Sequence, residues 1–489
     1  MSLNAIQALE RAWLRDRAKS SEQLDDTVRS TYEYALRLAA TSQITTRDGV
    51  RVCIAPHLTD LREQLLVHMS KISQCGWSFP GPEKQHGVGT LAWTGRWCRR
   101  QIIEGYPAVA RMLHTAISHL NRVCFALDEY SLQDALIQKK LVLALGGGGG
   151  TGFVHLCLFQ WLEEKNIQPS LITGTSIGGL LGYLRSLQYH YDAALSTIML
   201  PSLWQITKSL RPCIGSGRHG LVGMCRIDLS DIFTEISQAF GWTTAPSFNE
   251  LRIPFACVAS GILQKSPIIP SLESQSRNPV SALLNLTRMT WQNTMRHASH
   301  IASLIASQQA VIPTVFGFDE LTRVMTAVDA TMFSMLVPGV LTYELPRNHY
   351  RSREIVDTIF KRDGLYRLAD GGMASNVPVR AAREAVMNHK IGHENVYILG
   401  VDVFAPQTSD GIFYPLQQIA NTNAIVDATY ADAFIRLKYL LSPMNLSPSR
   451  ARMKWLNSRF RHAFSTEMDI ISYAMRPLHP LSTLDLGGF

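Results

Sequence analysis

An apolar run that ends in consecutive glycines constrains the fold of this chain more than any other feature. Residues 139–152 read KKLVLALGGGGGTG, and residues 153–166 follow with apolar side chains at helical spacing. This order predicts a buried strand, a tight glycine turn and a helix. Residues 170–187, SLITGTSIGGLLGYLRSL, repeat the same order. Strands that alternate with helices predict a mostly parallel sheet covered by helices on both faces.

The remaining sequence divides into three segments. Residues 253–262 and 395–404 read as further buried strands, so we expect an α/β domain over residues 137–410. Residues 1–136 have helical periodicity, most clearly in a helix that we expect to begin at Pro107. Residues 411–489 are again helical and rich in basic residues. The sequence therefore predicts an α/β domain flanked by helical N-terminal and C-terminal regions.

Composition excludes several classes of protein. The 489 residues are 46% hydrophobic and 18% charged, which is typical of a globular protein and not of a disordered or coiled-coil one. The eight cysteines are dispersed and form no CxxC pair, which indicates reduced thiols without a zinc site. We see no signal peptide and no apolar run long enough to span a bilayer. These features predict a cytoplasmic protein, although secretion without a signal peptide stays open.

The pentapeptide GTSIG, Gly174 to Gly178, lies where a predicted strand meets a predicted helix. A serine on such a turn is held in a strained backbone conformation with its hydroxyl above the sheet. Ser176 is therefore a candidate nucleophile. The alternative interpretation is a purely structural turn.

The glycine run has two functional interpretations. Gly147, Gly149 and Gly152 satisfy GxGxxG, which is typical of a dinucleotide site, but the strand that follows carries no acidic residue. The backbone amides of this loop would serve equally well as an oxyanion hole for an acyl intermediate.

A third feature is LYRLADGGMASNVP at 365–378, in which Asp370 precedes Gly371 and Gly372. An aspartate before two glycines is usually a turn residue. Together with the two motifs above, Asp370 is of more interest than a turn residue alone.

Three motifs follow one another along the chain: the glycine loop, the GTSIGG turn, and the DGG motif with downstream Asn376 and Pro378. Their order resembles that of the patatin-like phospholipases. The resemblance spans about residues 139–405. It implies a three-layer patatin-like fold and a lipid acyl hydrolase with a Ser–Asp dyad. It also implies Ser176 as nucleophile, Asp370 as base, the amides of Gly147, Gly148 and Gly149 as oxyanion hole, and no metal or cofactor. The sequence departs from the family at Thr151, where Arg or Lys is usual.

Two rival functions stay open at this point: a dinucleotide-dependent enzyme, and an acyltransferase or lipid-binding protein of the same fold. An ordinary triad hydrolase would need a later histidine, and we interpret the four candidates as surface residues: His389, His393, His462 and His479. His155, on the helix after the glycine loop, is expected to be a packed, hydrogen-bonded residue.

The net charge of +8 favours anionic partners. Residues 433–466 contain seven basic residues and no acidic one, with Trp455, Phe460 and Phe464 among them. This composition suits peripheral attachment to an anionic membrane surface, and a solvated basic helix is an equally good interpretation. The resemblance implies a lipid ester as substrate. No nucleic-acid-binding motif accompanies the charge, so no nucleic acid partner is expected. A second stretch without acidic residues, 274–318, suggests a lid or acyl-chain wall.

Overall fold

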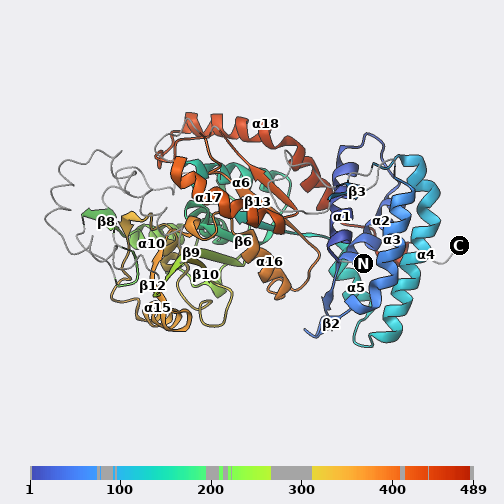
Figure 1. Ribbon diagram of the computed structural model, residues 1–489, viewed down its shortest axis with the longest axis horizontal. Helices are drawn as coiled ribbons and strands as arrows, with labels where there is room; N and C mark the ends of the chain where they lie inside the picture. Colours follow the sequence, from blue (N-terminus) through green and yellow to red (C-terminus); the bar gives the residue numbers. More distant parts are fainter. Residues whose placement is uncertain are drawn as a thin grey trace. The chain divides into compact units, whose positions relative to one another are not determined.

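The computed structural model describes residues 3–73, 77–78, 92–93, 96–193, 209–212, 218–221, 223–265, 311–407, 414–438 and 440–484. The chain folds into two compact units (Figure 1). The helical unit consists of Met1–Leu141, Glu384–Tyr397 and Phe464–Phe489, and the sheet unit consists of Val142–Arg383 and Ile398–Ala463. Most of the predicted lid, residues 274–310, lies outside the described residues.

Helices dominate the N-terminal part of the helical unit, as predicted. They are α1 (Leu3–Lys19), α2 (Asp26–Ala40), α3 (Thr59–Lys71), α4 (Arg99–Val123) and α5 (Glu129–Ile137). Two short antiparallel strand pairs interrupt them: β1 (Gln43–Thr45) with β2 (Arg51–Cys53), and β3 (Trp77–Ser78) with β4 (Ala92–Trp93). Helix α2 begins where the Asp25 carboxylate accepts the Thr27 amide, which satisfies one of the free N–H groups of the first turn.

The predicted start of α4 is wrong. Pro107 lies inside the helix, which begins at Arg99. A capping box formed by Cys98 and Gln101 satisfies the first-turn amides there, so the helix has a better start than the proline offers.

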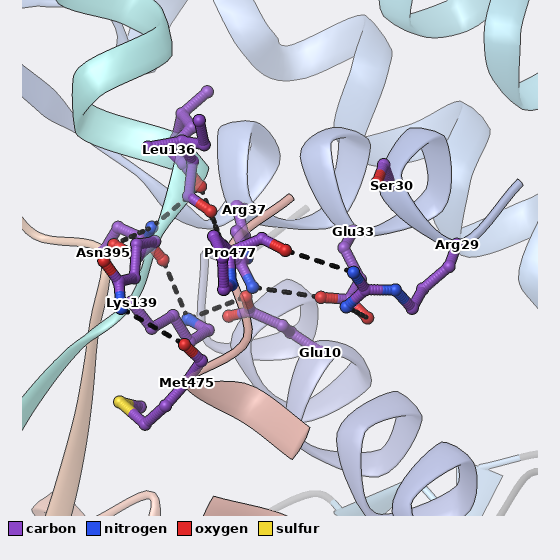
Figure 2. A network of polar contacts seen from close by, with 12 residues as sticks. Glu10, Arg29, Ser30, Glu33, Arg37, Leu136, Lys139, Asn395, Met475 and Pro477 are labelled. Carbon is purple, nitrogen blue, oxygen red and sulfur yellow. Dashed lines mark hydrogen bonds and ion pairs between the residues drawn. The ribbon is translucent and has the colours of Figure 1, made fainter. Parts of the chain in front are cut away.

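A buried polar network joins distant stretches of chain within the helical unit (Figure 2). Lys139 Nζ lies 2.8 Å from Glu10 Oε1 and donates to Asn395 Oδ1 at 3.0 Å. Arg37 donates to Glu33 at 3.0 Å. Arg37 also donates to the backbone carbonyl of Leu136. The side chains of Gln138 and Arg29 donate to the carbonyls of Met475 and Pro477, respectively. Removing one partner of such a buried pair typically costs about 3–5 kcal/mol, so the network holds these stretches together.

The sheet unit is built on a seven-stranded sheet in the order β10-β9-β6-β5-β13-β14, with β12 pairing to β9. Its strands are β5 (Lys140–Leu145), β6 (Pro169–Thr175), β9 (Phe255–Leu263), β10 (Val311–Phe316), β12 (Leu365–Ala369), β13 (Val396–Asp402) and β14 (Ala433–Arg436). The pairs β6–β9 and β13–β14 run parallel, whereas β10 and β12 run antiparallel to β9. A separate three-stranded sheet contains β7 (Leu210–Pro212), β8 (Gly223–Ile227) and β11 (Gly339–Thr342).

Helices cover both faces of the large sheet, which gives the predicted three-layer fold. They include α6 (Val154–Glu164), α7 (Ile177–Ser186), α14 (Ala327–Ser334), α16 (Val379–Met387) and α17 (Tyr414–Asp427). Thr173 Oγ1 donates to Pro378 O, just before α16, whereas a Cβ on Gly174 would meet Gly178 of α7. Because successive strand residues point to opposite faces, α7 and α16 lie on opposite sides of β6.

The four strands predicted from apolar runs are confirmed as β5, β6, β9 and β13. The structure adds β14, which lies beyond residue 410 and extends the sheet beside β13. Among the described cysteines, all six are free thiols, as predicted: Cys53, Cys98, Cys124, Cys157, Cys225 and Cys257.

Candidate active site

The strand register brings Ser176 and Asp370 together. Strand β6 runs parallel to β9 and ends with Thr175 opposite Val258. Strand β12 runs antiparallel to the same strand and ends with Ala369 opposite Ser260. The carboxyl ends of β6 and β12 therefore approach each other along β9. Ser176 and Asp370 are the next residues, and the Ser176 hydroxyl lies near enough to the Asp370 carboxylate to lower its pKa.

Ser176 occupies a strained turn between β6 and α7. Its φ of 52° and ψ of −124° lie in a region that costs a residue with a side chain on the order of 1–3 kcal/mol. The turn is tight because a Cβ on Gly174 would lie 2.5 Å from Gly178 O, and a Cβ on Gly178 would lie 2.3 Å from Leu145 O. Glycines at both positions let the strand and helix approach closely, as the GxSxG pattern predicts.

The end of α14 and the residues just after it hold the backbone of both residues. The Ser176 amide donates to Ser334 Oγ at 2.8 Å, and the Asp370 amide donates to Leu336 O at 2.8 Å. Ser334 Oγ in turn donates to Val258 O of β9. The sequence analysis gave Ser334 no role, because nothing in the residues shows from which amide a buried serine hydroxyl accepts a hydrogen bond.

Hydrogen bonds hold Asp370 in a defined orientation. Burial makes its carboxylate more basic than that of an exposed aspartate. Ser260 Oγ donates to its carbonyl at 2.7 Å, and its Oδ1 accepts the Gly372 amide at 2.9 Å. Burial raises the pKa of Asp370 to about 6, against the opposing effects of the Ser176 hydroxyl and the Gly372 amide. A carboxylate with this pKa is a better proton acceptor than an exposed aspartate and is still ionised at pH 7.

The glycine loop lies beside the nucleophile. A Cβ on Gly147 would come within 3.0 Å of Ser176 Cβ. The amide of Gly147, however, donates to Asn376 O at 3.1 Å, and the amide of Gly150 donates to Pro443 O at 2.7 Å. Of the three amides expected from the sequence, the Gly147 amide is therefore occupied.

The Gly148 and Gly149 amides, the other two expected oxyanion donors, differ from the Gly147 amide in their hydrogen bonding. Within the described residues, no hydrogen bond uses the amides of Gly148 and Gly149. The φ angles of Gly148 and Gly149 are 154° and 59°, which favour glycine at both positions. An oxyanion hole on this loop therefore rests on the Gly148 and Gly149 amides.

His155 and Asn376 complete the surroundings of the loop. His155 is fully buried, its Nε2 lies 3.0 Å from Gly146 O, and burial lowers its pKa to about 4. It is a neutral, packed residue, as expected. Asn376 Oδ1 lies close to both Gly147 and Gly372, and its buried Nδ2 has no partner among the described residues. Asn376 is part of the motif that follows Asp370, but the sequence analysis predicted no role for its side chain.

Replacing Gly148 with valine should inactivate the site. A Cβ there would lie 2.4 Å from Thr151 Oγ1 and 3.2 Å from Phe404, in a backbone conformation that branched residues rarely adopt. We expect at least about a hundredfold loss of ester hydrolysis, the size typical for loss of an oxyanion donor. Gly241→Val is the matched control, because Gly241 also has positive φ but has nothing within 4 Å of its Cβ position. Equal activity of the two variants would place the loop away from the chemistry.

The structure corrects two expectations about other side chains. His393 is only 9% exposed, with a pKa lowered by burial to about 4, so it is not a surface histidine. It forms a β-bridge with Ile44 of the helical unit. Phe460 and Phe464 are each 1% exposed, so they are core residues and not membrane anchors.

The comparisons with known proteins agree with this geometry. Residues 143–383 match the family model of the patatin-like phospholipases, so the chain contains a patatin-like phospholipase domain. It resembles lysophospholipase NTE1 of Mycosarcoma maydis, with 39% identity over 74 residues that cover 15% of this chain and 4% of that protein. The proteins of the same name from Kluyveromyces lactis and Candida glabrata are 33% and 42% identical over 88 and 62 residues, 17% and 13% of this chain. The matches cover only 4% to 6% of the relatives' length.

Proposed function

We propose that this protein is a serine lipid acyl hydrolase of the phospholipase A or lysophospholipase type, acting through Ser176 and Asp370. The observation that carries the proposal is the position of the Ser176 hydroxyl beside a buried aspartate whose pKa burial raises to about 6. Membership of the phospholipase family and the similarity to proteins named lysophospholipase support a glycerolipid ester as substrate.

In the proposed reaction, Ser176 Oγ attacks the ester carbonyl carbon while Asp370 takes its proton. The oxyanion accepts hydrogen bonds from the Gly148 and Gly149 amides. Asp370 then gives the proton to the leaving alcohol, which departs as the acyl-enzyme forms. A water molecule, deprotonated by the same carboxylate, attacks the acyl-enzyme; the fatty acid leaves and the proton returns to Ser176.

The dinucleotide alternative is less well supported. The GxGxxG loop lies against Ser176 Cβ, and β6 carries no acidic residue to bind a ribose hydroxyl. An acyltransferase would use the same acyl-enzyme but pass the acyl group to an alcohol other than water.

Fatty acid release from monoacyl and diacyl glycerophospholipids, measured with and without a long-chain alcohol acceptor, tests the proposal. We expect free fatty acid in both conditions. A folded protein that released no fatty acid from any ester would contradict it, and acyl transfer without hydrolysis would favour the acyltransferase.

A phospholipase must reach substrate held in an aggregate, and we propose that the start of α18 (Arg450–Ala474) binds anionic membranes. Arg450, Arg452 and Lys454 are exposed, and Trp455 is 48% exposed with the Arg459 guanidinium 5.8 Å from its ring centroid. These side chains remain the best candidates after Phe460 and Phe464 are assigned to the core. Within the described residues, no helix is long and apolar enough to span a bilayer.

Replacing Arg450, Arg452 and Lys454 with glutamine should weaken binding to anionic liposomes by roughly a hundredfold at low salt. Each basic residue near an anionic surface contributes about 1 kcal/mol, an effect that salt screens. Cosedimentation with anionic and neutral liposomes at two salt concentrations measures it. The matched control changes the exposed Lys71, Arg111 and Arg122 of the helical unit to glutamine. Equal losses in both triple variants would show a net-charge effect without a specific surface.

A further inference from the structure

Thr151 is buried in the glycine loop and bonded to the loop's own backbone. Its side chain is 2% exposed, and Oγ1 donates to Gly148 O at 2.8 Å. The Thr151 amide reaches the same carbonyl at 3.4 Å. One residue therefore holds the Gly148 carbonyl through both its side chain and its backbone.

This bond determines where the next amide points. The Gly148 carbonyl and the Gly149 N–H belong to one peptide unit, and in a trans peptide these groups point in opposite directions. The described part of the chain has no cis peptide bond. A carbonyl held against Thr151 therefore turns the Gly149 N–H away from Thr151.

The peptide needs such a restraint because it joins two glycines. Glycine populates positive and negative φ about equally, so a peptide between Gly148 and Gly149 can rotate at little cost. The Gly146–Gly147 peptide, two units earlier in the loop, is held at both ends: Gly146 O lies 3.0 Å from His155 Nε2, and the Gly147 amide donates to Asn376 O. At the Gly148–Gly149 peptide, the carbonyl bond to Thr151 provides the restraint.

We propose that Thr151 is a positioning residue for the oxyanion hole, whose hydroxyl fixes the Gly148–Gly149 peptide so that the Gly149 N–H faces the developing oxyanion. The inference rests on the proposed hydrolase function. It gives Thr151 a role that a basic residue at this position would not fill in the same way, because the hydroxyl acts through the backbone and not through charge.

The test compares three single variants with wild type on a short, monomeric ester. Thr151→Val keeps the shape and removes the hydroxyl, Thr151→Ser keeps the hydroxyl, and Thr173→Val removes a buried hydroxyl that donates to Pro378 O instead. Because an oxyanion hole acts in the transition state, Thr151→Val should lower kcat by about 10- to 100-fold with KM changed less than about threefold. Thr151→Ser and Thr173→Val should each keep kcat within about threefold of wild type.

A trifluoromethyl ketone that forms a tetrahedral adduct with the serine gives a second readout. Its affinity should fall in Thr151→Val by the same factor as kcat. Thermal unfolding checks that each variant folds, and Thr151→Ala, which adds no atoms, replaces the valine variant if that one does not.

Unchanged kcat in a folded Thr151→Val, or equal kcat losses in Thr151→Val and Thr173→Val, would overturn the inference. So would a kcat loss without a parallel loss of ketone affinity. Failure of the proposed function looks different: wild type itself would not hydrolyse the ester, or Ser176→Ala would hydrolyse it as well as wild type. In that case the inference fails together with the function.

Discussion

Ser176→Ala is expected to reduce ester hydrolysis by about 10⁴-fold or more, because the variant lacks the attacking oxygen. The backbone contact of this residue stays available, since the Ser176 amide and not its side chain donates to Ser334 Oγ. The serine side chain causes no steric clash that alanine would remove, so the unfolding temperature of the variant should stay close to that of wild type. Fatty acid release from a phospholipid and from a short ester measures the effect.

Ser186→Ala is the matched control for this substitution. Ser186 is buried in the same helix, α7, and its hydroxyl has no partner among the described residues. It should hydrolyse at nearly the wild-type rate. Activity of Ser176→Ala within about tenfold of wild type would rule out Ser176 as the nucleophile.

Asp370→Asn is expected to reduce turnover by about 10²–10⁴-fold, the range that a general base contributes. The amide keeps the shape and an oxygen for the Gly372 N–H, which Asp370 Oδ1 now accepts. It cannot take the Ser176 proton. Asp319→Asn, a change of the same kind in a loop carboxylate that accepts from Thr322, should be nearly silent for turnover.

The pH dependence of wild type follows from the same residue. Only the ionised carboxylate accepts a proton, and burial raises the pKa of Asp370 to about 6. The value of kcat/KM should therefore rise with pH up to about 6 and level off above it, and this step should be missing from the residual activity of Asp370→Asn. Full activity in Asp370→Asn, with loss in a variant of His389 or His462, would indicate an ordinary triad hydrolase.

The sequence was sufficient to single out the two residues that the structure brings together, Ser176 and Asp370, because each follows a strand and lies in a glycine turn. Apolar runs predicted β6, and GTSIG predicted the strained turn that the structure has at Ser176. What the sequence did not contain was the antiparallel course of β12, which directs Asp370 toward Ser176 from the opposite end.

Features that depend on backbone partners far away in the chain were beyond prediction. The Gly147 amide is occupied because Asn376 supplies a carbonyl, and the Gly150 amide because Pro443 does. Any residue type offers a backbone carbonyl, so no side-chain pattern marks these contacts. The burial of Phe460 and Phe464 was misjudged for a related reason: their spacing of four residues on α18 fits a core-facing stripe as well as a membrane face.

Reaction with a fluorophosphonate tests the central claim most directly, because it needs no knowledge of the natural lipid. The reagent phosphonylates a serine that is activated by a base and set beside an oxyanion hole. Intact mass and peptide mapping should show one adduct, on Ser176, with labelling slowed in Asp370→Asn and no adduct in Ser176→Ala. Labelling of a different serine, or of Ser176→Ala as readily as wild type, would contradict the account.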